Sequence, residues 1–182
     1  MSIYQQEKDW KDAIAVAWKY QQASKEDIRD IIAHYYCECS EQAINAGDLK
    51  EAEALASQAL VTDENCVRAS ILLGDLSIRG GKPQKAIRFY QQVDFQHVAF
   101  LPLVLEKLRN AYGSQSNLPE LINYLRGIER REDNVSVTCL LAALINETQG
   151  KEEALNYLLE RMQKAPSLQG VQQLLKLQPP SE

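Results

Sequence analysis

A chain of 182 residues that is 45% hydrophobic and 25% charged is typical of one well-packed soluble unit. Its net charge of −5 and the absence of a dense Lys/Arg cluster argue against a nucleic-acid binder. The longest apolar stretch, residues 137–145, is far short of the roughly 20 residues that span a bilayer. The N-terminal sequence MSIYQQEKDW has no signal-peptide pattern either, so we expect no direct membrane contact from this chain.

Apolar residues at helical spacing run through the whole chain, which contains only 8 Gly and 6 Pro to interrupt them. In chain order we expect helices near residues 9–22, 26–46, 48–61, 64–80, 83–93, 97–114, 117–129, 134–148, 150–164 and 167–176, and no strand. The helix near 9–22 is typical of the second helix of a hairpin, and that near 167–176 of an opening helix without a partner. Because such arrays normally end in polar capping repeats, we expect this one to be truncated at both ends.

A period of 34 residues relates the helices to one another. Shifting the chain by 34 places Cys39-Ser40 on Leu73-Gly74, Gly47 on Gly81, Ala52 on Ala86 and Ala56 on Tyr90. This period and these small and aromatic positions are those of tetratricopeptide repeats. Small residues let two helices approach closely, and glycine tolerates the left-handed backbone that ends a first helix. The sequence predicts an all-α tetratricopeptide-repeat solenoid of antiparallel helix hairpins. Residues 1–182 would form a single domain, with repeats near 1–32 (partial), 33–66, 67–100, 101–134, 135–166 and 167–182 (partial).

One tract of the chain is more specific than the repeat pattern. Ile32-Ala-His34-Tyr-Tyr-Cys37-Glu38, together with Asp9-Trp10-Lys-Asp-Ala-Ile, Ala69-Ser-Ile71, Gly74 and Gly81-Lys-Pro-Gln-Lys-Ala86, resembles the lipopolysaccharide assembly protein B family, over essentially the whole chain. Members of that family have an N-terminal membrane helix, a cytoplasmic tetratricopeptide array and a C-terminal rubredoxin-like metal knuckle with paired CxxC motifs. The membrane helix and the CxxC motifs are missing from this sequence, so we expect no cofactor in it and place the family's metal site beyond its C-terminus.

The resemblance also implies a function and a location. Family members are adaptors at the cytoplasmic face of the inner membrane of Gram-negative bacteria. They promote destruction, by a membrane-bound AAA+ protease, of the deacetylase that commits material to lipid A, and thereby regulate lipopolysaccharide synthesis. For this chain the resemblance implies a protein-interaction scaffold whose partners are that protease and proteins of the lipopolysaccharide pathway. We also predict that the exposed ends pair two copies into a homodimer.

Polar residues on the first helices of the hairpins are the candidate partner-binding groove. At 100° per residue, Asp75 and Arg79 lie within about 20° of Arg68 and clear of the packed face. The equivalent positions are His34, Glu41 and Asn45 in the preceding repeat and Asn110 in the following one. Solenoids bind extended partners along such a surface. The alternative is a merely solvated face, which any amphipathic helix has.

His34, Cys37 and Glu38 also invite a metal or a catalytic interpretation. They share a helix face, but a closed zinc site needs four ligands and a cysteine nucleophile needs a positioned base. We therefore expect no metal site and no catalytic residue. Cys37 and Cys39 point to different faces, which argues against a disulfide between them. We expect these two thiols, with Cys66 and Cys139, to be reduced in a cytosolic setting.

Two other functions remain as alternatives. A co-chaperone that clamps C-terminal peptides would need several Lys, Arg and Asn residues in its groove, whereas Glu41 and Asp75 add acidic groups here. An accessory domain of a glycosyltransferase-type enzyme would need a separate nucleotide-sugar domain, and no alternation of strand and helix patterns is present. The chain is accordingly expected not to be an enzyme.

Overall fold

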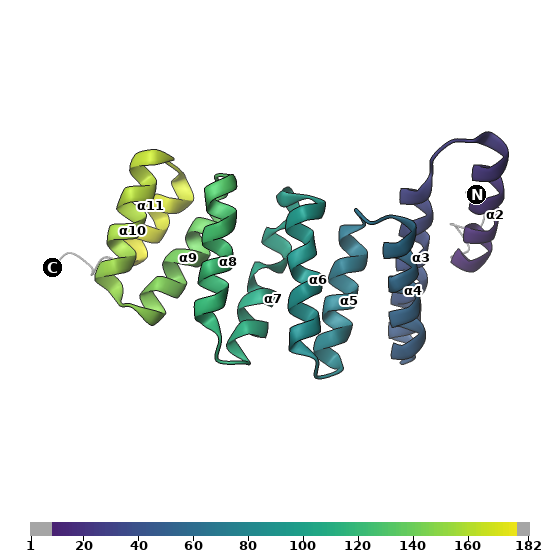
Figure 1. The fold of residues 1–182 in the computed structure, drawn as a ribbon, viewed down its shortest axis with the longest axis horizontal. Helices are drawn as coiled ribbons and strands as arrows, with labels where there is room; N and C mark the ends of the chain where they lie inside the picture. The colour runs from purple at the N-terminus through teal and green to yellow at the C-terminus, as the bar shows by residue number, and fades with distance from the viewer. Residues whose placement is uncertain (1–8, 178–182) are drawn as a thin grey trace. The chain divides into compact units, whose positions relative to one another are not determined.

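A computed structural model describes residues 9–177 of the chain, and the regular structure in that range is helical (Figure 1). The elements are α2 (Trp10–Ser24), α3 (Arg29–Asn45), α4 (Leu49–Thr62), α5 (Val67–Arg79), α6 (Pro83–Gln96), η1 (Val98–Phe100), α7 (Pro102–Gly113), α8 (Leu118–Arg131), α9 (Val135–Thr148), α10 (Lys151–Lys164) and α11 (Leu168–Leu177). The all-α prediction is confirmed. Across residues 9–177, no helix combines the length and the apolar character that crossing a membrane requires. The first eight residues of the partial repeat expected over 1–32 lie outside the described residues.

The predicted helices match the observed ones to within two residues, except at three starts and one end. The starts are those of α3, α5 and α7, and the end is that of α6, which continues to Gln96. The helix expected over 97–114 begins only at Pro102, after the 3-10 turn η1, because the extended backbone of His97 interrupts the chain there (φ −166°, ψ 103°). Proline suits the first position of a helix, where its missing N–H is not needed. The helix expected over 26–46 begins at Arg29, since Lys25 adopts a left-handed conformation (φ 60°) that ends α2 and starts a connecting segment.

The chain divides into two compact units, residues 1–104 and 105–182. The single-domain assignment to residues 1–182 stays a prediction. In the first unit α3 pairs with α4 and α5 with α6, and each pair is joined by a short turn (Figure 1). Gly47 and Gly81 occupy equivalent places in these turns with φ of 82° and 69°, the left-handed conformation that the 34-residue period predicted for them.

Close approach within each hairpin depends on the small residues of the repeat. Ser40 on α3 is fully buried and its hydroxyl donates to the carbonyl of Ala52 on α4 at 2.8 Å. At the equivalent position on α5, Gly74 lies directly against the ring of Tyr90 on α6. Tyr90 is itself buried, so these two residues form the centre of the α5–α6 contact. A small residue on the first helix therefore admits the second helix, as the sequence pattern predicted.

The second unit continues the same construction. α8, α9, α10 and α11 pack in sequence around buried leucines, among them Leu121, Leu141 and Leu158. Asn134 directly precedes α9, and its side chain accepts hydrogen bonds from the N–H groups of Ser136 and Val137 and so caps the helix. On α11 the side chains of Leu168, Val171 and Leu175 stay exposed on one helix face.

Candidate partner-binding surface

Arg68 at the start of α5 reaches back to three side chains of α3. Its Nη1 donates to Glu38 Oε1 at 2.6 Å and lies 3.2 Å from His34 Nδ1, while its Nε donates to Glu41 Oε1 at 3.1 Å. We call Arg68, His34, Glu38 and Glu41 the Arg68 cluster. Because the three α3 residues follow one another at helical spacing, they present a single face to the guanidinium. The cluster therefore links the first helices of two successive repeats.

The Arg68 cluster is partly shielded from water and carries an excess of negative charge. The side chains of Arg68 and Glu38 are 34% and 25% exposed, whereas those of Glu41 and His34 are 44% and 51% exposed. Burial disfavours the charged guanidinium, but the hydrogen bonds to Glu38 and Glu41 outweigh it and raise the pKa of Arg68. Two carboxylates face one guanidinium, so the cluster as a whole favours a cationic or N–H-bearing ligand.

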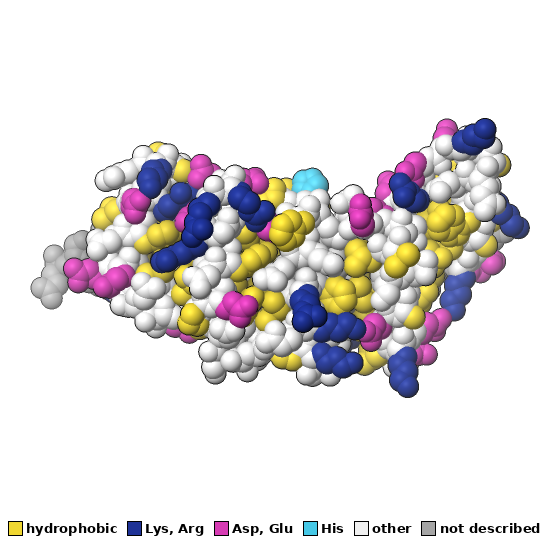
Figure 2. Space-filling model, in the orientation of Figure 1, with side chains coloured by type: hydrophobic (Ala, Val, Ile, Leu, Met, Phe, Trp, Pro, Cys, Tyr) yellow, Lys and Arg dark blue, Asp and Glu magenta, His cyan; other side chains and the backbone are white. Residues whose placement is uncertain are grey.

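An aromatic edge borders the cluster on the side of α2. The Trp10 ring stacks on Tyr35 with centroids 5.7 Å apart, and it meets the His34 ring edge-on at 6.4 Å. Tyr35 is buried, while Trp10 is half-buried and His34 exposed. The tryptophan thus packs against the core and also offers part of its surface beside the polar cluster. Hydrophobic side chains are visible in this region of the surface near α2 and α3 (Figure 2).

The other predicted groove residues are not drawn into this cluster. Asp75 accepts a hydrogen bond from the Tyr90 hydroxyl at 2.7 Å, so it supports the contact between α5 and α6. Arg79 and Asn45 are exposed at the C-terminal ends of α5 and α3, and Asn110 is exposed on α7 in the second unit. The structure thus joins His34, Glu41 and Arg68, and adds Glu38, which the groove prediction missed. Glu38 could have been included from the sequence, since it lies one helical turn after His34 on the same helix.

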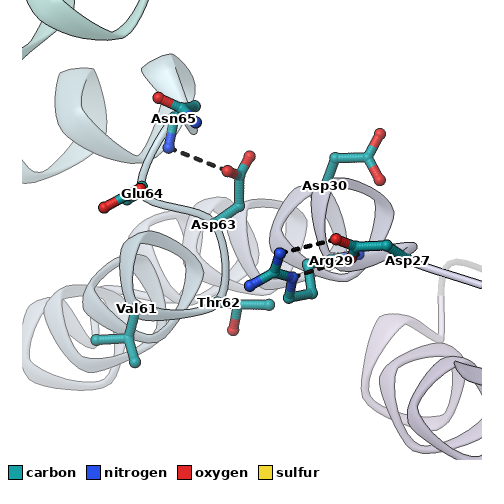
Figure 3. A pocket seen from close by; sticks show the side chains of 8 residues that line it. All are labelled: Asp27, Arg29, Asp30, Val61, Thr62, Asp63, Glu64 and Asn65. Atoms are coloured by element: carbon teal, nitrogen blue, oxygen red, sulfur yellow. Dashed lines mark hydrogen bonds and ion pairs between the residues drawn. The ribbon is translucent and has the colours of Figure 1, made fainter. Parts of the chain in front are cut away.

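A cavity that the sequence did not indicate opens at the turns between helices of the first unit. Its volume is about 580 Å³ (Figure 3). It is lined by Asp27, Arg29, Asp30, Val61, Thr62, Asp63, Glu64 and Asn65. Four carboxylates against one guanidinium make the lining acidic. Asp30 and Glu64, which are one period of 34 residues apart, both line the cavity, and this offset is the signal that could have located it.

Two local contacts position carboxylates of that cavity. Arg29 binds both carboxylate oxygens of Asp27, at 2.9 Å from Nε and 2.7 Å from Nη2 (Figure 3). These hydrogen bonds lower the pKa of Asp27 to about 2. On the opposite wall Asp63 accepts the backbone N–H of Asn65 at 3.0 Å, which shapes the turn into α5. Elsewhere, acidic and basic side chains are interspersed on the face drawn in Figure 2.

The cysteines do not form the metal or catalytic site that the spacing of His34, Cys37 and Glu38 could suggest. Cys37 is fully buried, and its sulfur lies 3.7 Å from the sulfur of Cys66 at the start of α5, whereas His34 contacts Arg68. Cys37 and His34 are therefore not a nucleophile and its base. Within the described range 9–177 there is no group of three or more His, Cys, Asp or Glu side chains placed to hold a metal ion. That the chain needs no cofactor stays a prediction.

Comparison with known proteins gives relatives along nearly the whole chain. Lipopolysaccharide assembly protein B of Escherichia coli strain K12 is 28% identical over 175 residues, which is 96% of this chain and 45% of that protein. The protein of the same name from Haemophilus influenzae is 30% identical over 165 residues, 91% of this chain and 41% of its own length. The chain thus spans less than half the length of the relatives it matches. No family model matches it.

Solved structures with the same fold have low sequence identity to this chain. MamA superposes with a TM-score of 0.53 at 14% identity, covering 95% of this chain and 93% of MamA. YrrB, described as a tetratricopeptide protein with an unusual peptide-binding site, superposes with a TM-score of 0.51 at 14% identity, covering 88% of this chain and 93% of YrrB. Together with the hairpins and their glycine turns, these likenesses confirm the predicted helical-repeat fold. The 28–30% identity over 91–96% of this chain confirms the predicted resemblance to lipopolysaccharide assembly protein B.

Proposed function

We propose that this chain is a protein-binding adaptor, and that the Arg68 cluster with the neighbouring Trp10 edge is where it contacts a partner. The observation that carries the proposal is the position of a partly exposed tryptophan on α2 beside an ion-paired polar cluster on α3 and α5, the first helices of two successive hairpins. Tryptophan and arginine are the residue types most enriched at interface hot spots. YrrB, which has the same fold, is described as having a peptide-binding site, and this supports a peptide as the ligand.

The geometry of the cluster suggests what the bound segment looks like. Arg68 holds Glu38 and Glu41 in place, so little side-chain freedom is lost when a ligand arrives. The more exposed carboxylate, Glu41, and the exposed His34 ring remain accessible to a partner. A Lys or Arg side chain would neutralise the excess negative charge, and an apolar residue next to it would cover Trp10. We infer an extended partner segment in which a basic residue adjoins an apolar one.

We further propose that this binding serves lipopolysaccharide synthesis. The support is 28–30% identity to lipopolysaccharide assembly protein B over 91–96% of this chain. On this proposal the partners are a membrane-bound AAA+ protease and the lipid A pathway deacetylase that it degrades, and the chain acts at the cytoplasmic face of the inner membrane. It presents substrate to protease and catalyses no reaction itself, in keeping with its likeness to tetratricopeptide scaffolds.

The test compares two charge reversals on opposite helices of one hairpin. Glu41 on α3 belongs to the Arg68 cluster, and Glu53 on α4 pairs with Lys85 at 2.5 Å. Glu53 is a matched control for Glu41, since their side chains are 43% and 44% exposed and each pairs with a basic residue of the next repeat. Affinity for the purified protease and the purified deacetylase would be measured for each variant, and folding would be checked by circular dichroism.

We expect Glu41→Arg to weaken binding of one of these two proteins about tenfold or more, while Glu53→Arg binds as the unaltered chain does. If Glu53→Arg alone weakens binding, the second helices carry the interface and the Arg68 cluster does not. If neither protein binds the unaltered chain, the assignment to proteolysis of the deacetylase is wrong.

A further inference from the structure

Two cysteines from different repeats meet sulfur to sulfur in the first unit. Cys37 lies in the middle of α3 and Cys66 is the residue before α5, and their Sγ atoms are 3.7 Å apart. A disulfide bond is about 2.0 Å long, so the sulfurs would have to approach by about 1.7 Å. Side-chain rotation at Cys66, which is only half-buried at the end of a turn, is the natural source of this movement.

We propose that Cys37 and Cys66 are a reversible oxidation site, at which a hydroperoxide joins them in a disulfide between α3 and the start of α5. The proposal goes beyond the adaptor function and does not depend on it. It rests on the sulfur contact, on the access of solvent to Cys66 and on the burial of Cys37 behind it.

The two other cysteines are placed differently. Cys39 is 2% exposed and packs with Ile14 and Ile32 between α2 and α3, away from Cys37. Cys139 is half-buried on α9 in the second unit. Among the described residues, Cys37 and Cys66 are the cysteines with a sulfur–sulfur contact. We therefore expect the disulfide to form between Cys37 and Cys66 and not to involve Cys39 or Cys139.

The surroundings assign different roles to the two thiols. The hydrogen bond from Cys37, aided by the N–H of Ala69 in the first turn of α5, lowers the pKa of the Cys66 thiol to about 7. Sharing its proton with Cys66, and burial, raise the pKa of Cys37. The nucleophile is the thiolate, and the accessible thiol with the lower pKa is the one that meets an oxidant first. Cys66 is therefore the attacking residue, and Cys37 is the resolving residue.

The reaction balances with one molecule of hydroperoxide. The Cys66 thiolate attacks the peroxide oxygen, the O–O bond breaks, and Cys66 becomes a sulfenic acid while the departing oxygen takes a proton and leaves as water or an alcohol. The Cys37 sulfur then attacks the Cys66 sulfur, the S–O bond breaks, and the hydroxide leaves with the Cys37 proton as water. The two thiols are oxidised by two electrons in all and the peroxide is reduced by two. A dithiol reductant reverses the step by exchange.

Oxidation would link α3 to the start of α5 covalently, next to the Arg68 cluster. The new bond would close a loop that contains the whole of α4, and it would anchor the first turn of α5 on α3. Glu38 follows Cys37 directly, and Arg68 comes two residues after Cys66. A disulfide across a loop of this length typically raises the melting temperature of a domain of this size by roughly 5–10 °C.

The test treats the 182-residue chain with hydrogen peroxide, blocks the remaining thiols under denaturing conditions, and maps disulfides by mass spectrometry. Trypsin leaves Cys37 and Cys39 in one peptide, so fragmentation of the linked peptide identifies the cysteine that is joined. We expect an intramolecular Cys37–Cys66 link, lighter by two hydrogen atoms, that dithiothreitol removes. We also expect the oxidised monomer to melt roughly 5–10 °C higher than the reduced one.

Two variants act as controls. Cys66→Ser should abolish both the link and the rise in melting temperature, while Cys139→Ser should change neither. Links between chains, a link to Cys39, or a Cys66 sulfinic acid beside an alkylatable Cys37 would each overturn the proposal. So would an oxidised monomer that contains the link but melts no higher than the reduced chain, since the sulfurs would then be joined only by distorting the fold.

Discussion

Replacing Gly74 by alanine tests the close contact that organises the α5–α6 hairpin. A Cβ atom at this position would lie 2.6 Å from Cδ1 and 2.8 Å from Cζ of the Tyr90 ring, and nearer still to Cε1. Carbon atoms in ordinary contact are about 3.5–4.0 Å apart, so either the ring or the helix must move by about 1 Å. The ring cannot swing away freely, because it is buried and its hydroxyl is held by Asp75 at 2.7 Å.

Two opposing terms decide the size of the effect. Alanine is favoured over glycine in a helix interior by about 1 kcal/mol. Overpacking a well-filled contact costs about 1–3 kcal/mol, and here the obstacle is the body of an aromatic ring. Because the Tyr90 ring is rigid and buried, we expect an overpacking cost of about 2–3 kcal/mol, in the upper part of that range. After the gain in helix propensity is subtracted, Gly74→Ala should lower the free energy of unfolding by about 1–2 kcal/mol. For a chain of this length that corresponds to a fall in melting temperature of roughly 3–6 °C.

Gly127→Ala is the matched control, because Gly127 also lies inside a helix, α8, and a Cβ there would meet nothing within 4 Å. It should raise stability by about 0.5–1 kcal/mol. Urea unfolding followed by circular dichroism measures both variants. In a double-mutant cycle, Tyr90→Leu should remove most of the penalty of Gly74→Ala. Gly74→Ala that is as stable as Gly127→Ala would refute the reasoning.

Four further outcomes are expected. NMR titration should give a pKa of about 2 for the Asp27 carboxyl, and this pKa should return toward 3.8 in Arg29→Gln. The stability that the Asp27–Arg29 pair contributes should be complete above the unfolded-state pKa of Asp27 and should disappear as the pH falls toward 2. Arg79→Ala should leave urea unfolding unchanged, whereas Arg68→Ala should lower stability by about 1 kcal/mol, because two carboxylates lose their partner. The purified chain should contain no stoichiometric zinc or iron by elemental analysis, and a chelator should not shift its melting temperature. Light scattering should show concentration-dependent dimers that Val171→Asp on the apolar face of α11 disperses.

The hairpins could be predicted from the sequence because small residues and glycines recur at fixed positions of each tetratricopeptide repeat. Glycine at 47 and 81 marks the turns, and the small residues at 40 and 74 mark the close helix contacts, all at one offset of 34. The start of α7 was missed since apolar spacing continues across the extended residue His97, and only the backbone shows the interruption.

Individual side-chain partners were predictable only where they follow the repeat offset. His34 and Arg68 are 34 residues apart and they meet, as the equivalence of repeats implies. Asp75 shares a helical face with Arg68, but the Tyr90 hydroxyl of the following helix binds it, and helical angles on one helix cannot show that. Cys37 and Cys66 are 29 residues apart, an offset set by the shape of the α4–α5 turn and not by the period.

The ion pairs on α4 have a consequence for the order of the hairpins. Glu51 binds Lys11 of the preceding helix α2 at 2.9 Å, while Glu53, two residues later, binds Lys85 of the following helix α6 at 2.5 Å. The α3–α4 hairpin therefore matches one basic residue on each neighbour, and the two matches are not interchangeable. If this hairpin were moved to another place in the array, its carboxylates would lose both lysines although the apolar packing rules were still obeyed. Surface ion pairs of modest strength thus favour one position in the array for the α3–α4 hairpin, which the apolar packing rules alone would not distinguish.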